Sequence, residues 1–326
     1  MKSITFLARV AIPLALLAGA ASAHAQTYPT KPLRMVVPFA PGGPNDILAR
    51  LISQKLTEAW GQTVIVDNRG GAGGTVGLEA ASRLPGDGYA LAMGASSNLA
   101  VAPSLYAKLP YDSIKDFTPI INVAIVPYAL AVNPTVPAKN IKELITVAGK
   151  KPGYLSYGSS GMGSMSSLAA EMLKSMSKTN IVHVPYKGTA PALTDVVSGQ
   201  IDLMLADLAV IQPHASTGRL RVIGVTGSKR SGAAKDIPTI AESGLPGYEL
   251  SPWFGVVAPA GVPKEIVSRL NAVIGDSLKS ADMLQRLGVL GYEPLGGTPE
   301  QFAATIKTDI AKYAKIVKDA GIKANL

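Results

Sequence analysis

Two glycine-rich turns, one in each half of the chain, are the stretches best suited to chemistry. The first, PFAPGGPND at 38–46, follows the apolar pair Val36 and Val37 and precedes a helix whose apolar face begins at Ile47. The second, GSSGMGS at 158–164, separates a short strand from a helix that starts near Met165. A helix start with only small residues before it presents free N–H groups and the positive end of its dipole. Both turns therefore have the properties of an anion-binding site.

Side-chain caps are predicted for both helices. Asn45 or Asp46 is expected to cap the first helix, and Ser164 or Ser166 the second. If the two helix starts face each other across a cleft, their N–H groups and the serine hydroxyls can hold a carboxylate between two domains. The alternative is that each turn is only a tight connection between a strand and a helix.

The sequence offers little for catalysis or metal binding. After the predicted leader, two histidines remain, His183 inside a predicted strand and His214, and they share no metal-ligand spacing. The serines at 159–160 resemble a nucleophile elbow, but no G-x-S-x-G occurs there. We predict a protein that is not an enzyme and has no metal site and no cofactor. An exported hydrolase with Ser159 or Ser160 as nucleophile is the competing interpretation, and it lacks a visible base.

Two further polar or glycine-rich stretches follow predicted strands of the first half. The segment GAGGTV at 71–76 nearly matches the dinucleotide fingerprint, but Val76 stands where the third small residue belongs. A glycine-rich turn lining a cleft is the simpler interpretation. The segment ASSN at 95–98 places polar groups at the carboxyl end of a strand, where ligands bind in open α/β sheets.

Composition indicates an exported globular protein. Residues 1–25 contain Lys2, Arg9, a short apolar run and small-x-small cleavage patterns, as in a signal peptide cleaved near Ala25. The chain has no cysteine, so no disulfide and no lipid-modified cysteine is possible, and a bacterial periplasm is the expected location. Without Lys2 and Arg9 the 29 basic and 22 acidic residues leave a net charge of +7. These charges are scattered, which favours a solvated surface and no nucleic-acid partner.

Strands alternate with helices through both halves of the 326 residues, which predicts an α/β protein of two domains, each a mostly parallel sheet flanked by helices. The apolar segment Phe117–Val132 is long enough for two strands or one crossing between domains, with a bend at Pro127. Helices expected at 264–280, 283–287 and 299–320 have no strands of their own and should return to cover the first domain.

Five blocks of sequence support a family resemblance. They are YPTKP at 28–32, VPFAPGGPND at 37–46, VDNRGGAGG at 66–74, YGSSGMGS at 157–164 and VPYKG at 184–188. In this order the chain resembles the tripartite tricarboxylate transporter receptors, the Bug family of periplasmic solute-binding proteins. The resemblance implies a two-domain periplasmic-binding-protein (flytrap) fold with two interdomain crossings. It also implies a monomer that captures a small organic carboxylate and delivers it to the membrane subunits of such a transporter.

The resemblance also suggests boundaries and a ligand site. Domain 1 would comprise residues 26–125 and 253–326, domain 2 residues 126–252, and the hinge would lie near 126–132 and 249–253. The site residues carried over from domain 1 are Phe39, Pro41, Gly42, Gly43, Asn45, Asp46, Ser96, Ser97 and Asn98. Those from domain 2 are Ser159, Ser160, Gly161, Gly163, Ser164, Thr189 and Asp207. Thr189 and Asp207 would approach the distal part of the ligand. A receptor that signals through a sensor kinase would use the same cleft.

Overall fold

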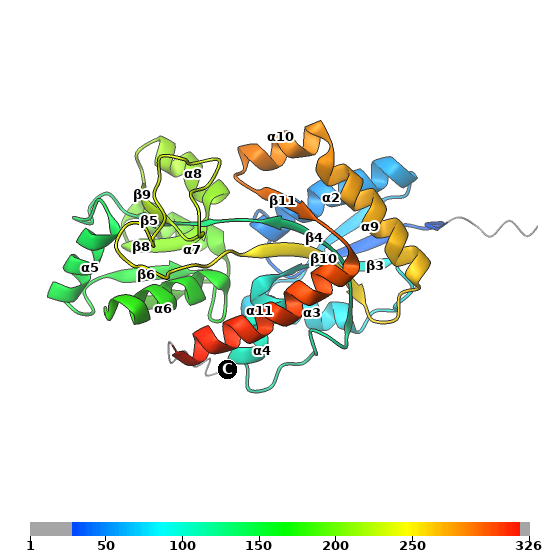
Figure 1. The fold of residues 1–326 in the computed structure, drawn as a ribbon, viewed down its shortest axis with the longest axis horizontal. Coiled ribbons are helices and arrows are strands. Elements are labelled where there is room, and N and C mark those ends of the chain that lie inside the picture. The colour runs from blue at the N-terminus through cyan, green and yellow to red at the C-terminus, as the bar shows by residue number, and fades with distance from the viewer. Residues whose placement is uncertain (1–27, 320–326) are drawn as a thin grey trace, which may run out of the picture.

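The computed structural model describes residues 28–319, so the predicted signal peptide and the end of the last predicted helix lie outside the described residues. The chain forms two lobes, each built on one sheet with helices on both faces (Figure 1). A six-stranded sheet organises the first lobe and a five-stranded sheet the second. The predicted two-domain α/β architecture is therefore confirmed.

The sheet of the first lobe has the order β11-β4-β10-β3-β1-β2. Its strands are β1 (Leu33–Val37), β2 (Val64–Asn68), β3 (Ala90–Ala95), β4 (Phe117–Ile125), β10 (Trp253–Pro259) and β11 (Glu293–Gly296). Strand β1 pairs in parallel with β2 and β3, whereas the pairs β10–β3, β10–β4 and β11–β4 are antiparallel. The prediction of a mostly parallel sheet is wrong here, because β10 returns from the second lobe and enters the sheet running in the opposite direction.

The second lobe has the sheet order β7-β6-β8-β5-β9. Its strands are β5 (Tyr128–Val132), β6 (Ser156–Ser159), β7 (Val182–Pro185), β8 (Leu203–Asp207) and β9 (Arg221–Val225). Strand β6 pairs in parallel with β7 and β8, and β5 pairs antiparallel with β8 and β9. This sheet is also mixed, for the same reason: β5 carries the chain in from the other lobe.

Helices of the first lobe include α2 (Pro44–Trp60), where Leu48, Ile52 and Leu56 recur every four residues and are buried. The others are the short helix η2 (Ala72–Gly74), α3 (Thr75–Ser82), the π-helix η3 (Ser97–Val101), α4 (Ala102–Leu105), α9 (Lys264–Lys279), α10 (Ala281–Val289) and α11 (Pro299–Asp319). Helices α9 and α11 pack against β4, which confirms that the last helices cover the first lobe. The expectation that they bring no strand is wrong, since β11 follows α10.

Helices of the second lobe are α5 (Ile141–Lys150), α6 (Met165–Ser177), α7 (Thr189–Ser198) and α8 (Leu208–Ser216). The sequence did not indicate α8, whose interior contains Pro213. A proline at the start and a glycine at the end predict a helix near Pro191 to Ser198, followed by Gly199. Helix α7 begins two residues earlier, at Thr189, and ends as predicted before Gly199, which adopts the left-handed conformation.

The chain crosses between the lobes twice, as predicted. It leaves the first lobe between β4 and β5 and returns just before β10. The two crossing segments lie side by side, because the N–H of Val126 donates to the carbonyl of Pro252 at 2.8 Å. The loops at the carboxyl ends of β1, β3, β6 and β7 meet next to this double crossing, and they form the candidate site.

Candidate functional site

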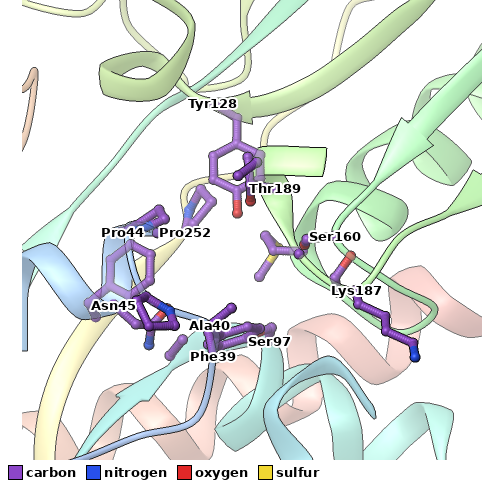
Figure 2. Close-up of a pocket in the computed structure, with 18 of the residues that line it drawn as sticks. Phe39, Ala40, Pro44, Asn45, Ser97, Tyr128, Ser160, Lys187, Thr189 and Pro252 are labelled. Atoms are coloured by element: carbon purple, nitrogen blue, oxygen red, sulfur yellow. The ribbon is translucent and has the colours of Figure 1, made fainter. Parts of the chain in front are cut away.

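A cavity of about 70 Å³ lies between the lobes and is called the inner cavity here. Its lining comes from both lobes and from both crossings: Phe39, Ala40, Pro41, Gly43, Pro44, Asn45, Ala95, Ser96, Ser97, Tyr128, Ser160, Ser164, Met165, Lys187, Gly188, Thr189, Ala190, Pro191, Pro252 and Phe254. Figure 2 shows Tyr128 and Thr189 on one wall, opposite Phe39 and Ser97. By volume the cavity has room for roughly five water-sized groups.

Three helix N-termini converge on the inner cavity. Helix α2 starts after Gly43, α6 after Ser164 and α7 after Gly188, and all three residues line the cavity. At α2 and α7 the N-cap is a glycine, which has no side chain to accept an N–H of the first turn. The first-turn N–H groups of these two helices therefore have no capping side chain, and they remain available to a bound anion. The sequence predicted the starts of α2 and α6 as anion-binding turns and the start of α7 within two residues.

The caps correct one prediction. Asn45 and Asp46 lie inside the first turn of α2 and do not cap it, because the helix already begins at Pro44. In the second lobe the prediction is confirmed, since the Ser164 hydroxyl accepts the N–H of Ser167 at 3.2 Å.

A chain of serine hydroxyls holds the turn before α6. The Ser166 hydroxyl accepts the N–H of Ser160 at 2.9 Å and lies 3.0 Å from the Ser160 hydroxyl. It also lies 2.9 Å from the hydroxyl of Ser164. These contacts fix two hydroxyl groups of the lining before any ligand arrives, so less conformational entropy is lost on binding.

The electrostatics of the inner cavity suit an anion. Within residues 28–319, the lining contains no aspartate or glutamate, and Lys187 supplies a positive charge at the edge. Burial, with the nearby Asp207 carboxylate, raises the pKa of Tyr128 well above its usual range. Tyr128 therefore stays protonated and can donate its hydroxyl hydrogen into the cavity.

Nine of the sixteen predicted site residues line the inner cavity. They are Phe39, Pro41, Gly43, Asn45, Ser96, Ser97, Ser160, Ser164 and Thr189. Gly161 lines a second, wider chamber next to it. Six others lie outside both linings: Gly42, Asp46, Asn98, Ser159, Gly163 and Asp207. The first lobe thus lines the inner cavity with the turn at 38–46 and with Ser96 and Ser97, and the carboxylate of Asp46 is not part of the lining.

Asp46 orders its own loop. Its carboxylate accepts the N–H of Gly42 at 3.0 Å and the side chains of Arg50 at 2.9 Å and Asn68 at 3.0 Å. Burial opposes its charge, but the hydrogen bonds from Arg50, Gly42 and Asn68 hold the pKa of Asp46 below its usual value. The charge of Asp46 is thereby neutralised within its own loop, outside the lining of the inner cavity.

Asp207 is sealed between the lobes and does not reach the cavity. Its carboxylate accepts the hydroxyl of Tyr292, from the first lobe, at 2.6 Å and the N–H of Ala209 at 2.9 Å. The residue is 1% exposed, and burial raises its pKa to about 7 against the hydrogen bonds that lower it. The structure gives no support to the expectation that Asp207 approaches a ligand.

The raised pKa of Asp207 predicts a pH dependence of stability. The contribution of Asp207 to the unfolding free energy is fully present below pH about 4 and is lost as pH rises through about 7. The reason is that the carboxyl group ionises at a lower pH in the unfolded chain than in the folded protein. Asparagine does not titrate, so the unfolding free energy of Asp207→Asn should fall less than that of the wild type between these two pH values. The difference should be on the order of 4 kcal/mol. Urea unfolding from pH 4.5 to 8 measures this. Asp46→Asn is the control and should leave the slope unchanged, and an unchanged slope in Asp207→Asn would contradict the assignment.

Ser159 and His183 form a contact that the sequence did not indicate. Ser159 Oγ lies 2.6 Å from His183 Nε2, and it accepts the N–H of Gly161 at 3.2 Å. The imidazole stacks on Tyr157 with ring centroids 4.5 Å apart, and burial lowers the pKa of His183. The expectation that no base accompanies these serines is wrong, because the parallel β6–β7 pairing brings His183 beside the end of β6. Ser159 is fully buried and lines neither cavity, so it presents no nucleophile there.

Several lining residues escaped sequence reasoning. Tyr128 and Phe254 are aromatic residues in apolar strands. Lys187 belongs to the VPYKG block, whose lysine was quoted without a role. The only indication that these residues line the cavity was their position in the sequence, because each stands next to a predicted turn or interdomain crossing.

Residues 28–319 contain neither a candidate membrane span nor a cluster of metal ligands. None of the helices there has the length and hydropathy that a bilayer span requires. Over the same residues, no three His, Cys, Asp or Glu side chains gather as metal ligands.

Comparison with known families gives one match that covers most of the chain. The model described as "Tripartite tricarboxylate transporter family receptor" matches residues 48–322. Protein BugT of Bordetella pertussis is 34% identical over 324 residues, covering 99% of each chain.

Solved structures agree with this match. R. palustris Rpa4515 with adipate is 39% identical, covers 91% of this chain and 99% of its own, and superimposes with a TM-score of 0.88. MatC (Rpa3494) from Rhodopseudomonas palustris with bound malate is 32% identical, covers 89% of this chain and all of its own, and has a TM-score of 0.84. Both neighbours are structures with a bound small carboxylate.

Proposed function

Because the chain belongs to the tripartite tricarboxylate transporter receptor family, whose members are periplasmic solute-binding receptors, we propose that it captures a small organic carboxylate in the inner cavity. The observation that carries this proposal is the convergence of three helix N-termini, one from the first lobe and two from the second, on a lining without acidic residues. Free N–H groups at these starts bind an anion without needing an arginine. Adipate and malate, the molecules bound by two structural neighbours, are of this chemical class.

Capture of the ligand is coupled to closure of the lobes in this proposal. Residues 26–125 with 253–326 form one moving domain and residues 126–252 the other, with the hinge at the double crossing. A ligand that touches α2 on one side and α6 and α7 on the other binds the closed state better than the open state. This difference in affinity is what drives closure.

The closed receptor then delivers its ligand to the membrane subunits of a tripartite tricarboxylate-type transporter. It acts in the periplasm as a monomer, after cleavage of a signal peptide near Ala25. It is not an enzyme in this account and needs no cofactor.

The proposal is tested by thermal unfolding of the mature protein against mono-, di- and tricarboxylates, amino acids and aromatic acids. A ligand at a hundred times its dissociation constant adds about 2.7 kcal/mol to stability. The midpoint should rise by roughly 5–10 °C with one chemical group of acids. The matched uncharged amides of the active acids are the control and should give no shift. Shifts with the amides as large as with the acids would contradict an anion site.

A hydrolase is the second candidate, and the Ser159–His183 contact is the observation that favours it. Against it stands the burial of Ser159, which leaves a substrate no approach to the hydroxyl oxygen. Methyl esters of the active acids, incubated with the protein and followed by proton NMR, separate the two functions. We expect the esters to remain intact, whereas turnover that disappears in Ser159→Ala would establish the hydrolase.

A further inference from the structure

The wider chamber beside the inner cavity, called the outer chamber here, has a volume of about 710 Å³. Its lining is Phe39, Ala40, Pro41, Asn68, Gly70, Gly71, Ala72, Gly73, Gly74, Ser160, Gly161, Met162, Pro185, Tyr186 and Lys187. Five residues line both spaces: Phe39, Ala40, Pro41, Ser160 and Lys187. The two spaces are therefore neighbours with a shared edge, and Lys187 lies on it.

The inner cavity cannot hold a long ligand alone. At about 70 Å³ it accommodates one carboxylate and a short stem. The rest of the ligand must pass the shared edge into the outer chamber. There it meets apolar side chains such as Met162 and Pro185 and the backbone of the glycine turn at 70–74.

Lys187 is the charged residue in this path. No other side chain with a full charge lines either space within the described chain, and no ion pair or hydrogen bond occupies its ammonium group there. The neighbouring residue Tyr186 donates its hydroxyl to the carboxylate of Asp195 at 2.5 Å. Figure 2 shows the Lys187 side chain extending away from Tyr128 and Thr189. The ammonium group of Lys187 is therefore available to an anionic group at the shared edge, away from the helix starts where the first carboxylate binds.

We propose that Lys187 is the specificity-determining residue for a second anionic group of the ligand, so that the protein prefers dicarboxylates over monocarboxylates of equal length. The proposal rests on the proposed function of the inner cavity. One carboxylate binds at the helix starts, the chain crosses the shared edge, and the second carboxylate pairs with the Lys187 ammonium group. Closure of the lobes removes water from this pair and strengthens it.

Adipate and hexanoate form a matched pair of ligands for the test, because both have six carbons and they differ by one carboxylate. Isothermal titration calorimetry should give the wild-type protein at least about tenfold tighter binding of adipate. Lys187→Gln should weaken adipate about tenfold and leave hexanoate within about twofold. Added salt should weaken adipate binding more in the wild type than in Lys187→Gln. Succinate and butyrate repeat the comparison at four carbons.

Lys108→Gln is the matched control, since Lys108 is an exposed lysine that lines neither space. It should leave both affinities unchanged. Equal binding of the mono- and dicarboxylates by the wild type, or an equal effect of Lys187→Gln on both, would overturn the role of Lys187 and leave the proposed function standing. Failure of every carboxylate to bind the wild type would instead overturn the proposed function, and this inference with it.

Discussion

Thr189→Asp is expected to abolish carboxylate binding while the protein remains folded. Thr189 is the first residue of α7 and lines the inner cavity beside Tyr128 (Figure 2). An aspartate there places a negative charge where the ligand carboxylate must sit. Two like charges about 4 Å apart repel by about 4 kcal/mol at an effective dielectric constant near 20. Affinity should therefore fall on the order of a hundredfold to a thousandfold.

The fold should tolerate this change because an acidic residue in the first turn interacts favourably with the helix dipole. Thr189→Asn is the matched control, with the same size as aspartate and no charge, and it should cost far less affinity. Isothermal titration calorimetry with the tightest acid gives the affinities, and a thermal scan without ligand verifies folding. Equal affinities of the Asp and Asn variants would show that no anion binds near α7.

Gly77→Ala is expected to lower the stability of the fold markedly. A Cβ atom at this position would lie 2.5 Å from both the carbonyl oxygen of Arg69 and the Cα of Pro38. Both neighbours are backbone, so helix α3 would have to move away from β1. Overpacking of this kind costs about 2–3 kcal/mol, which lowers the unfolding midpoint by roughly 5–10 °C.

Gly149→Ala is the matched control for this prediction. Gly149 also lies within a helix, α5, but a Cβ atom there would meet nothing within 4 Å. Alanine should raise stability there by up to about 1 kcal/mol, because it has the higher helix propensity. Differential scanning calorimetry compares the two variants with the wild type. Similar effects of the two substitutions would mean that α3 does not pack tightly against β1.

Gly77 also resolves the near-match to the dinucleotide fingerprint. The fingerprint's third glycine lets a helix pack closely on a strand, and the sequence places Val76 there. In the structure the close contact is made one residue later, at Gly77. The turn before α3 therefore lines the outer chamber with its glycine backbone, in agreement with the simpler interpretation of this stretch.

Local sequence signals predicted most of the elements that build the site. The turns at 38–46 and 158–164 could be read because proline, glycine and serine act within a few residues of their position. The start of α7 was misplaced because its N-cap is Gly188, at φ 141°, without the polar side chain that usually marks a cap. The predicted start of this third helix in the cavity is two residues late for that reason.

Long-range contacts account for what the sequence could not predict. Asp207 was assigned to the ligand by its position in the family resemblance, but its carboxylate is bonded to the hydroxyl of Tyr292, 85 residues later. The pairing of Ser159 with His183 depends on the register of β6 against β7, which no local pattern specifies. The mixed sheets follow from strands that enter each lobe from the other, and only the tertiary fold determines their direction.

The most direct test of this account is a crystal structure of the mature protein with the tightest acid of the panel. The account predicts one carboxylate in the inner cavity, its oxygens about 2.7–3.2 Å from backbone N–H groups at the starts of at least two of α2, α6 and α7. A carboxylate bound outside this cavity, or held there by side chains while the three helix starts contact only water, would contradict it.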